Sequence, residues 1–381
     1  MQWQERDREV GDGFMKDWQI EDEHYQEQIL QRVSRSFALT IPQLPARLRT
    51  PVANAYLLCR IADTIEDESA LSTAARLKAL RRFVAVVRAK DEPASLVGEL
   101  LPQLSRRTSA AERGLVRNME RIIRVNARLQ ASQRCAIERC VEVMCDGMHR
   151  FQRIASLRGL PNMRALDEYC YFVAGVVGEL LTELFCDYSP KIAQRRNRLH
   201  ELDISFGQGL QMTNILKDIW EDRSQGACWL PQDIFSRHDI DVAALSALNR
   251  DNDFALALSE LIGVTHAHLR NALSYTLLIP AEESGIRRFC LWTIGLALLT
   301  LRNMQRRPHF TSGKQVKVSH GDVFATQLLS SASVRHDWML IRLFHWAARG
   351  LPLASIETVY RSSPASHARG SEAFATLGQI R

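Results

Sequence analysis

The sequence predicts an all-α fold, and three observations lead to this prediction. Apolar residues recur at spacings of three and four along most of the chain, which is the period of an amphipathic helix. The 381 residues include only 19 glycines and 12 prolines, below the roughly 7% and 5% of average soluble proteins, so long elements are expected. The alternation typical of a strand is limited to residues 316–318.

The expected helices follow one another with only short interruptions. Pro51 is expected to begin a helix, because proline is tolerated in the first turn. No shift in composition marks a boundary, so we predict one all-α domain over 21–360, between a polar segment at 1–20 and a flexible tail at 361–381. The helical ranges are 21–48, 51–69, 73–90, 112–130, 132–155, 165–187, 199–222, 240–246, 253–278, 285–305 and 321–361.

Charge and cysteine content limit the classes of partner and compartment. The net charge is only +6, and arginines alternate with acids, so a nucleic-acid partner is not expected. The eight cysteines form no CxxC pair and are predicted to be buried in a reducing, cytoplasmic protein. The polar N-terminus shows no signal peptide, and the apolar stretch at 289–301 is too short for a transmembrane helix.

Two short acidic motifs lie within apolar helical segments. Their sequences are DTIED at residues 63–67 and DIWED at residues 218–222. In each motif the first acid precedes the others by three and four residues, so the three carboxylates share one helix face. Asn214 lies one turn before Asp218 on the same face. A single motif of this kind is usually a solvated charged face, but two with equal spacing favour a cation site.

Carboxylates crowded on apolar helices suit Mg²⁺, which takes oxygen ligands together with waters and substrate phosphates. Two such clusters facing each other could hold Mg²⁺ ions that bind a diphosphate leaving group. Arg60 and Lys217 precede the motifs and could either neutralise this diphosphate or pair locally with the acids. The predicted metal-binding residues are Asp63, Glu66, Asp67, Asn214, Asp218, Glu221 and Asp222.

A third segment, YCYFVAGVVGEL at residues 169–180, carries small residues within a helix. Ala174, Gly175 and Gly178 form one smooth stripe, and Gly207 and Gly209 repeat the pattern later. Such a stripe either lets two helices pack closely or forms a groove in which a long apolar chain lies. The spacing favours neither alternative.

Together and in this order, these segments resemble the squalene/phytoene synthase family of isoprenoid synthases. The resemblance begins with SRSF at residues 34–37, includes both acidic motifs, residues 169–175 and WLPQ at 229–232, and extends to about residue 325. It implies an all-α isoprenoid synthase bundle around a central cavity. It also implies Mg²⁺-dependent, head-to-head condensation of two prenyl diphosphates.

The resemblance also implies roles for individual residues. Phe172 occupies a position often held by a tyrosine that acts in the first step, so Tyr169 or Tyr171 is expected to act instead. The implied catalytic residues are Tyr169, Tyr171, Tyr56 and Phe289, the aromatic rings stabilising a carbocation. The implied substrate contacts are Ser36, Tyr56, Gln211, Val173 and Gly178, and the implied cofactor contacts are Arg35, Arg60, Lys217 and Lys317.

Within the family, the chain is most similar to the squalene synthases. The features that it shares with them are DTIED, the pair Phe289–Cys290 and GKQVKVSHG at residues 313–321. This branch implies two farnesyl diphosphates as substrates, a cyclopropyl diphosphate (presqualene diphosphate) as intermediate, and reduction by NADPH to squalene with release of diphosphate. One departure is Ser319–His320, which replaces the family's usual basic pair.

Two alternatives to a squalene synthase stay open. One is a phytoene- or dehydrosqualene-type synthase that does not reduce its product, and another is a catalytically silent scaffold protein. The intact acids of both motifs argue against the scaffold. A late helix could also contact a membrane peripherally, or pack onto the bundle instead, through Trp338, Met339, Ile341, Leu343, Phe344 and Trp346.

Overall fold

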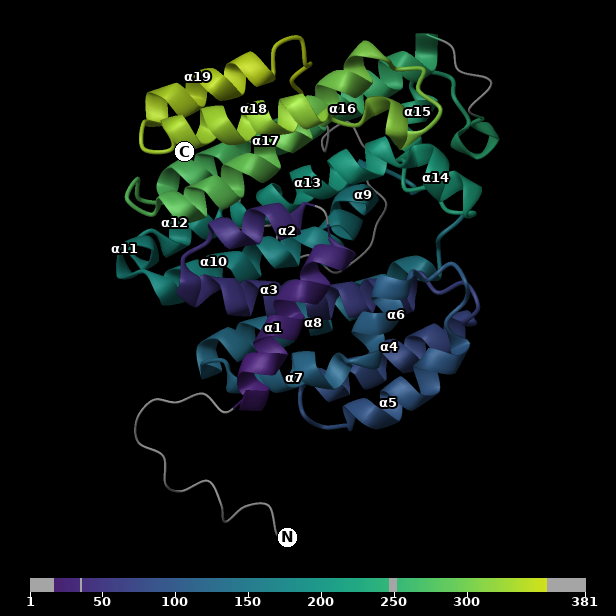
Figure 1. Ribbon diagram of the computed structural model, residues 1–381. Coiled ribbons are helices and arrows are strands. Elements are labelled where there is room, and N and C mark those ends of the chain that lie inside the picture. Colours follow the sequence, from purple (N-terminus) through teal and green to yellow (C-terminus); the bar gives the residue numbers. More distant parts are fainter. Residues whose placement is uncertain (1–16, 35, 247–251, 355–381) are drawn as a thin grey trace, which may run out of the picture.

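The computed structural model describes residues 17–34, 36–246 and 252–354, and helices form every layer of it (Figure 1). The α-helices are, in chain order, α1 (Asp17–Val33), α2 (Phe37–Thr40), α3 (Ala46–Glu66), α4 (Thr73–Val87), α5 (Pro93–Leu100), α6 (Ala110–Arg117), α7 (Met119–Arg128), α8 (Ala131–Gln152), α9 (Met163–Cys170), α10 (Val176–Tyr188), α11 (Pro190–Ala193), α12 (Arg196–His200), α13 (Asp203–Lys217), α14 (Ile219–Ser224), α15 (Gln232–Ser236), α16 (Asn252–Leu278), α17 (Ser284–Arg306), α18 (His320–Ser333) and α19 (Asp337–Ala347).

Short helices of other types connect or interrupt these elements. A π-helix, η3 (Tyr171–Gly175), joins α9 to α10, so the three form one continuous helical rod. Such π segments are rare and often lie at functional sites. The 3₁₀ helices are η1 (Ile41–Gln43), η2 (Leu101–Gln103), η4 (Val242–Ala244) and η5 (Gly313–Val316).

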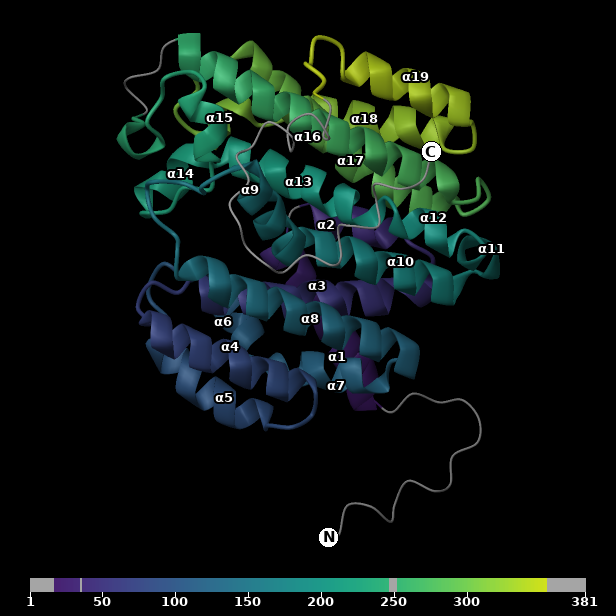
Figure 2. The ribbon, with the colours of Figure 1, turned by 180° about the vertical axis from the view of Figure 1, so that it is seen from behind.

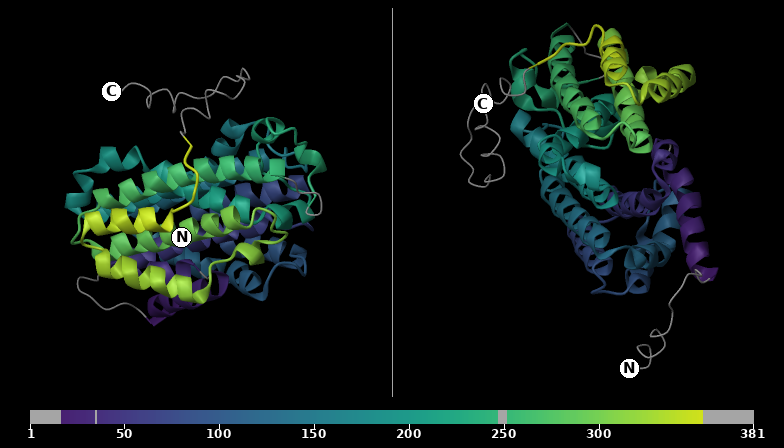
Figure 3. Two further views of the ribbon diagram at one scale, coloured as in Figure 1. Left: turned by 90° about the horizontal axis from the view of Figure 1, so that it is seen from above. Right: turned by 90° about the vertical axis from the view of Figure 1, so that its left-hand side faces the viewer.

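The helices are stacked in the order of the chain. In Figures 1 and 2, α1 and α3–α8 form one end of the molecule, α9, α10 and α13 form the middle, and α15–α19 form the other end. Helix α13 packs most extensively against α16 and also against η3 and α10. The views in Figure 3 place α18 and α19 on the outside of α17. The middle layer therefore joins the two acidic segments, one at the end of α3 and one at the end of α13.

The predicted all-α fold is confirmed, and several helical ranges agree closely. The ranges at 253–278 and 285–305 correspond to α16 and α17, while 73–90 and 132–155 correspond to α4 and α8. Asn162 and Ser72 cap their helices with side-chain oxygens that accept from Ala165 N and Ala75 N. The described residues contain no strand, only an isolated bridge between Leu160 and Pro231.

Other predicted ranges are wrong in their bounds. The range 21–48 is divided into α1, α2 and η1, and 321–361 is divided near residues 334–336, with residues 355–361 outside the described chain. Only η4 forms within 240–246. The segment 316–318 is no strand, because Val316 ends η5. Pro51 lies inside α3, which begins five residues earlier after Pro45, so the helix tolerates one missing backbone donor.

One contiguous core runs through the layers from Ile29 to Ala348. The single domain over 21–360, the polar segment at 1–20 and the tail at 361–381 stay predictions, since residues 1–16 and 355–381 lie outside the described chain. All eight cysteines are free thiols, and seven are buried as predicted. Cys135 is the exception, because it lies on the exposed face of α8.

Two helical stretches of the described chain are long and apolar enough to cross a membrane, judged by length and composition alone. They are Met163–Tyr188 and Ser284–Arg306. Within the fold, 56% and 72% of their apolar windows are buried, as in core helices. This is weak evidence for a span, and the prediction of no transmembrane segment stays a prediction.

Candidate active site

The first acidic motif lies at the C-terminal end of α3. Glu66 is the last residue of the helix, and Asp67 follows as its C-cap with its backbone N–H bonded to the Asp63 carbonyl. The Glu66 carboxylate is buried and accepts a 3.1 Å hydrogen bond from Gln152 Nε2 of α8. Arg76 of α4 donates to the Gln152 side chain at 2.8 Å and to the Glu66 carbonyl at 3.1 Å. Gln152 and Arg76, which the sequence analysis missed, therefore orient Glu66.

Arg60 and a third helix complete this side of the site. The Arg60 guanidinium lies 3.7 Å from Asp63 Oδ2 and forms an ion pair with Glu112 at the start of α6. Glu112 also closes a capping box with Ser109, which fixes its position. Glu112 is a further carboxylate beside the motif, and its capping-box pattern was the available sequence signal.

The second motif lies where α13 gives way to α14. Asp218 is the junction residue, with φ −100° and ψ 16°, so the motif does not lie on one regular helix. The i to i−4 hydrogen bonds continue across the junction, from Asp218 N to Asn214 O and from Asp222 N to Asp218 O, each 2.9 Å. Asn214, Asp218 and Asp222 therefore keep the one-turn spacing that the sequence predicts. Lys217 Nζ lies 3.1 Å from Asp218 Oδ2 and 3.3 Å from Asn214 Oδ1.

Glu221 has a different environment from the other acids. Its Oε1 accepts hydrogen bonds from Ser312 Oγ at 2.8 Å and from Gly313 N at 3.0 Å. Ser312 and Gly313 begin a late basic segment, residues 312–321. This segment therefore lies directly against the second motif. Lys317, the predicted cofactor contact, is exposed just after η5, and its carbonyl accepts from Asn303 Nδ2 of α17 at 3.4 Å.

The electrostatics place the two motifs near each other. Burial raises the pKa of Asp222 to about 7, and the charges of Asp218 and of Asp67 in the other motif add to this. Burial also raises the pKa of Asp63 to about 7 and of Glu66 to about 8, with Asp67 adding to both. These raised pKa values indicate that the positive charges nearby do not balance the negative charges of the acids. Asp63 and Asp218 each keep 38% of their side-chain surface accessible, so a ligand can reach both.

Tyr169 is a buried residue of α9. Burial raises the pKa of its hydroxyl well above the usual value, and the charges of Glu66 and Asp222, one from each motif, add to this. Its ring is stacked on Trp229, with centroids 4.2 Å apart and an angle of 8°. The ring of Phe151 meets it edge-on at 5.2 Å. Tyr169 is therefore held rigidly beside the acids.

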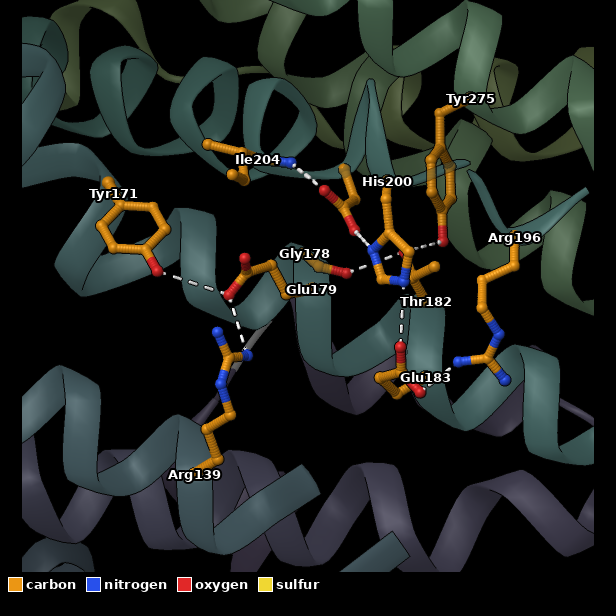
Figure 4. A network of polar contacts seen from close by, with 11 residues as sticks. Arg139, Tyr171, Gly178, Glu179, Thr182, Glu183, Arg196, His200, Ile204 and Tyr275 are labelled. Atoms are coloured by element: carbon orange, nitrogen blue, oxygen red, sulfur yellow. Dashed lines mark hydrogen bonds and ion pairs between the residues drawn. The ribbon is translucent and has the colours of Figure 1, made fainter. Parts of the chain in front are cut away.

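Tyr171 points elsewhere. Its hydroxyl donates to Glu179 Oε2 at 3.4 Å, and Arg139 donates to the same oxygen at 3.0 Å, as Figure 4 shows. The Arg139 side chain is more than half exposed, so this network lies toward the outside of the middle layer. Of the two tyrosines left open by the sequence, only Tyr169 senses both acidic motifs.

The glycine stripe serves helix packing at two of its positions. A Cβ atom on Gly178 would lie 2.0 Å from the Asp203 carbonyl oxygen, and one on Gly207 would lie 2.1 Å from the Ala174 carbonyl oxygen. These backbone approaches join α10 and η3 to α13. The backbone of α13 occupies the space where a side chain of residue 178 would lie, and the substrate contact at Gly178 stays a prediction. In Figure 4, Gly178 lies within the helix beneath Ile204.

The remaining predicted residues are scattered around this centre. Tyr56 packs on Phe37 with centroids 4.9 Å apart, and its hydroxyl donates to the Val33 carbonyl at 3.4 Å. Val173 and Gln211 are half-buried, and Ser36 is exposed at the start of α2. Arg35 lies outside the described residues.

Phe289 is part of the core, where its ring meets that of Phe185 edge-on at 6.3 Å. This environment favours ordinary packing over contact with a carbocation. Phe172, the residue at the family's tyrosine position, packs its Cβ 2.2 Å from where a side chain on Gly147 would begin.

No closed metal cage exists in the described part of the chain. There, no three His, Cys, Asp or Glu side chains lie close enough together to hold a metal ion by themselves. Mg²⁺ usually keeps waters and is bound through one or two carboxylates and substrate phosphates. Accessible carboxylates on two facing motifs fit such shared coordination.

An all-α bundle with two facing acidic motifs defines the class of isoprenoid synthases. The model of the squalene/phytoene synthase family matches residues 30–322, and the chain belongs to this family. A squalene synthase of Eremothecium gossypii is 29% identical over 279 residues, covering 72% of this chain and 60% of the relative. One of Cochliobolus lunatus is 27% identical over 322 residues, covering 83% and 74%.

Solved structures support the fold. A structure of TcSQS in complex with a ligand has a TM-score of 0.68 at 22% identity, covering 86% of this chain and 91% of that one. A dehydrosqualene synthase complex has a TM-score of 0.60 at 20% identity, covering 83% and 96%. The chain spans only about three fifths of the first curated relatives, 60% and 61% of their lengths.

Proposed function

We propose that this protein is a squalene synthase. It condenses two farnesyl diphosphates head to head, through presqualene diphosphate, and reduces the product to squalene with NADPH while diphosphate is released. The observation that carries the proposal is the pair of acidic motifs at the ends of α3 and α13, in a chain that matches the squalene/phytoene synthase family over residues 30–322. Three curated relatives that are named squalene synthases support the same substrate and product.

The acids of the two motifs form the diphosphate-binding end of the site. Mg²⁺ bound there would stabilise the charge on the departing diphosphate. Asp67 is exposed and Asp63 and Asp218 are partly accessible, and Arg60 and Lys217 beside the latter two neutralise part of the local charge. When a diphosphate binds, both cations are close enough to turn toward it. Arg60 and Lys217 thus pair with the acids before the diphosphate binds and contact the diphosphate once it is bound.

The aromatic residues next to the acids keep water from the reacting carbons. Tyr169, Trp229 and Phe151 form one stacked and buried group on the apolar side of the motifs. An allylic carbocation is stabilised by aromatic faces and is captured by water wherever water can enter. We assign the tyrosine role of the first step to Tyr169, since Tyr171 is engaged with Glu179.

NADPH supplies the hydride of the second step, and its binding residues are the finer part of the proposal. Lys317 lies on the segment that packs against the second motif, and Arg60 and Lys217 lie at the acids. Ser319 carries no positive charge that could bind NADPH. Its side chain caps α18, since its Oγ accepts a hydrogen bond from Asp322 N at 3.1 Å. This capping favours the second candidate, a dehydrosqualene- or phytoene-type synthase without reduction.

One assay separates the two candidates. Purified protein is incubated with farnesyl diphosphate and Mg²⁺, with and without NADPH, and both diphosphate release and the hydrocarbon product are measured. Squalene that forms only with NADPH supports the squalene synthase. A hydrocarbon that is unchanged by NADPH supports the second candidate, and absence of diphosphate release contradicts both.

We also propose that the protein is cytoplasmic and contacts membranes peripherally through α18 and α19. The predicted aromatic set divides into two faces, with Phe344 buried and Trp338 and Trp346 exposed at 60% and 56%. Arg342 and Arg302 lie over these two tryptophan rings at 5.4 and 5.6 Å. Tryptophan and arginine together are typical of interfacial helices, and Phe324 and Leu328 of α18 extend the apolar surface.

A further inference from the structure

The late basic segment is attached to the second acidic motif through one carboxylate. Ser312 Oγ and Gly313 N both donate to Glu221 Oε1, at 2.8 and 3.0 Å. Hydrogen bonds to a charged acceptor are stronger than those between neutral groups. The Ser312 Oγ also accepts from Lys314 N at 3.3 Å, so the same side chain begins η5. Glu221 thus fixes the start of this segment.

The backbone at Gly313 lies close to the second acidic motif. A Cβ atom on Gly313 would lie 3.0 Å from both Asp218 Oδ1 and the Lys217 carbonyl oxygen. Gly313 itself is buried. The segment therefore lies close against the second acidic motif, and a side chain at position 313 would require its neighbours to move.

The other edge of the segment is held by α17. Asn303 Nδ2 donates to the Val316 and Lys317 carbonyls at 3.2 and 3.4 Å, and Arg307 donates to the Gln315 carbonyl at 3.2 Å. Val316 is fully buried between these attachments. Lys317, which follows directly, projects from a segment that is fixed on two sides.

Glu221 differs in exposure from the acids that a ligand can reach. Its Oε1 is occupied by the two donors, and its Oε2 is closed off from solvent without a hydrogen-bond partner among the described residues. Asp218, three residues earlier, keeps 38% of its side chain accessible. The metal ligation predicted for Glu221 stays a prediction.

We propose that Glu221 is a positioning residue, which docks residues 312–317 onto the second acidic motif and thereby places Lys317 for NADPH. The inference rests on the proposed function, since Lys317 matters only if a reductant binds. The docking contact joins the site of diphosphate departure to the site of reduction. Loss of the contact should therefore impair the use of NADPH and spare the first condensation.

The test uses Ser312→Ala in the full chain, with Gly313→Ala as a second variant and Ser236→Ala, an exposed serine of α15, as the matched control. Three quantities are measured. They are the rate of trypsin cleavage after Lys314 and Lys317 in the unliganded protein, the KM for NADPH in squalene formation, and diphosphate release from farnesyl diphosphate without NADPH.

The expected result is faster cleavage at both lysines and a KM for NADPH raised about tenfold in Ser312→Ala, as for loss of one hydrogen bond to a charged group. Diphosphate release without NADPH should stay within about twofold of the wild type, since the bond to Ser312 lies outside the diphosphate site. Gly313→Ala should also show faster cleavage and a higher KM for NADPH, but its added methyl group would lie 3.0 Å from Asp218 Oδ1, so only Ser312→Ala reports on diphosphate release. Ser236→Ala should match the wild type.

Two results would overturn the inference. One is unchanged cleavage and unchanged KM for NADPH in both segment variants. The other is a loss of diphosphate release in Ser312→Ala as large as its loss in the use of NADPH, which would make Glu221 part of the metal site. Failure of the proposed function looks different. In that case the wild type itself would not respond to NADPH, while the cleavage assay would still report whether the segment is docked.

Discussion

At the scale of single residues, accessibility separates the acids of the two motifs. Glu66 is enclosed by Gln152, and Glu221 by Ser312 and Gly313, whereas Asp63 and Asp218 are open. Crowded carboxylates repel one another, which costs stability unless a ligand uses the charge. The open acids are therefore the ones that we expect to bind Mg²⁺ and diphosphate.

Asp63→Asn and Asp218→Asn should each reduce diphosphate release on the order of 100-fold or more, because each removes charge stabilisation at the leaving group. The measurement is diphosphate release with farnesyl diphosphate and Mg²⁺, beside circular dichroism to verify helicity. Glu201→Gln, an exposed acid after α12, is the control. Near-normal activity in both aspartate variants would contradict the metal assignment.

The two tyrosines give a sharper comparison, because they differ by two positions in the chain. Tyr169→Phe should lower the rate of the first condensation about tenfold or more, since it removes a hydroxyl held beside both acidic motifs. Tyr171→Phe should change that rate by less than about twofold, because its hydroxyl only contacts Glu179. Single-turnover formation of the cyclopropyl intermediate is the measurement. The reverse order of effects would transfer the role to Tyr171.

A buried histidine between α13 and α16 predicts a pH effect on stability. Burial lowers the pKa of His268 to about 4, although Asp167 Oδ1 lies 3.7 Å from its Nε2. The unfolded chain takes up a proton near pH 6.5 and the folded one only near pH 4, so stability falls as the pH falls between these values. The full contribution is present above pH 6.5.

His268→Gln should remove this dependence. Between pH 7 and pH 4.5, the wild type should lose about 2–3 kcal/mol more free energy of unfolding than the variant. Urea unfolding at both pH values measures the difference, with the exposed His336→Gln as control. Equal losses in wild type and His268→Gln would show that the buried imidazole titrates normally.

At the scale of the elements, the contact between α10 and α13 depends on glycine. Gly178→Ala would place a methyl group 2.0 Å from the Asp203 carbonyl oxygen, which is backbone and cannot move alone. We expect a loss of roughly 1–3 kcal/mol of stability from this overpacking. Gly98→Ala in α5 is the matched control, since nothing lies within 4 Å of the added methyl group. It should stabilise the protein by roughly 0.5–1 kcal/mol.

Thermal unfolding of both variants checks this prediction. If Gly178→Ala unfolds at the temperature of the wild type, α10 and α13 can separate at small cost, and a groove beside Gly178 becomes the better interpretation. If Gly98→Ala is the less stable of the two, helix propensity is not the dominant effect in α5.

The elements also show where prediction from sequence is reliable. Long apolar helices such as α16 and α17 were placed within a residue or so, because their periodicity persists over many turns. The sequence does not predict the helix breaks after Val33, at Asn118 and at Asp218, since the apolar period continues through them. Tertiary contacts decide these junctions, and no local sequence signal marks them. The π-helix at 171–175 was likewise invisible to a period of 3.6.

At the scale of the whole molecule, the two acidic motifs were predictable, because their spacing alone places carboxylates one helical turn apart. Which groups converge from distant elements was not predictable. Glu112, Gln152 and Ser312 reach the motifs from α6, α8 and the segment before η5. Their roles come from packing of the layers, on which a single sequence carries no direct signal.

The outer pair α18 and α19 carries the last prediction, binding to membranes. Wild-type protein should co-sediment with anionic vesicles more than with neutral ones, because Arg302 and Arg342 flank the exposed tryptophans. Trp338→Ser combined with Trp346→Ser should weaken this binding at least about tenfold, since two interfacial anchors are lost. The squalene proposed as product is itself insoluble in water, so delivery of product into the bilayer gives this surface a function.

Trp18→Ser is the control for this surface. Trp18 is an exposed tryptophan that also lies beside two arginines, Arg124 and Arg128, but it belongs to α1 at the opposite end of the molecule (Figure 1). Its loss should leave vesicle binding unchanged if orientation matters. Equal weakening by Trp18→Ser would mean that binding is unspecific, and no binding of the wild type to either kind of vesicle would contradict membrane contact altogether.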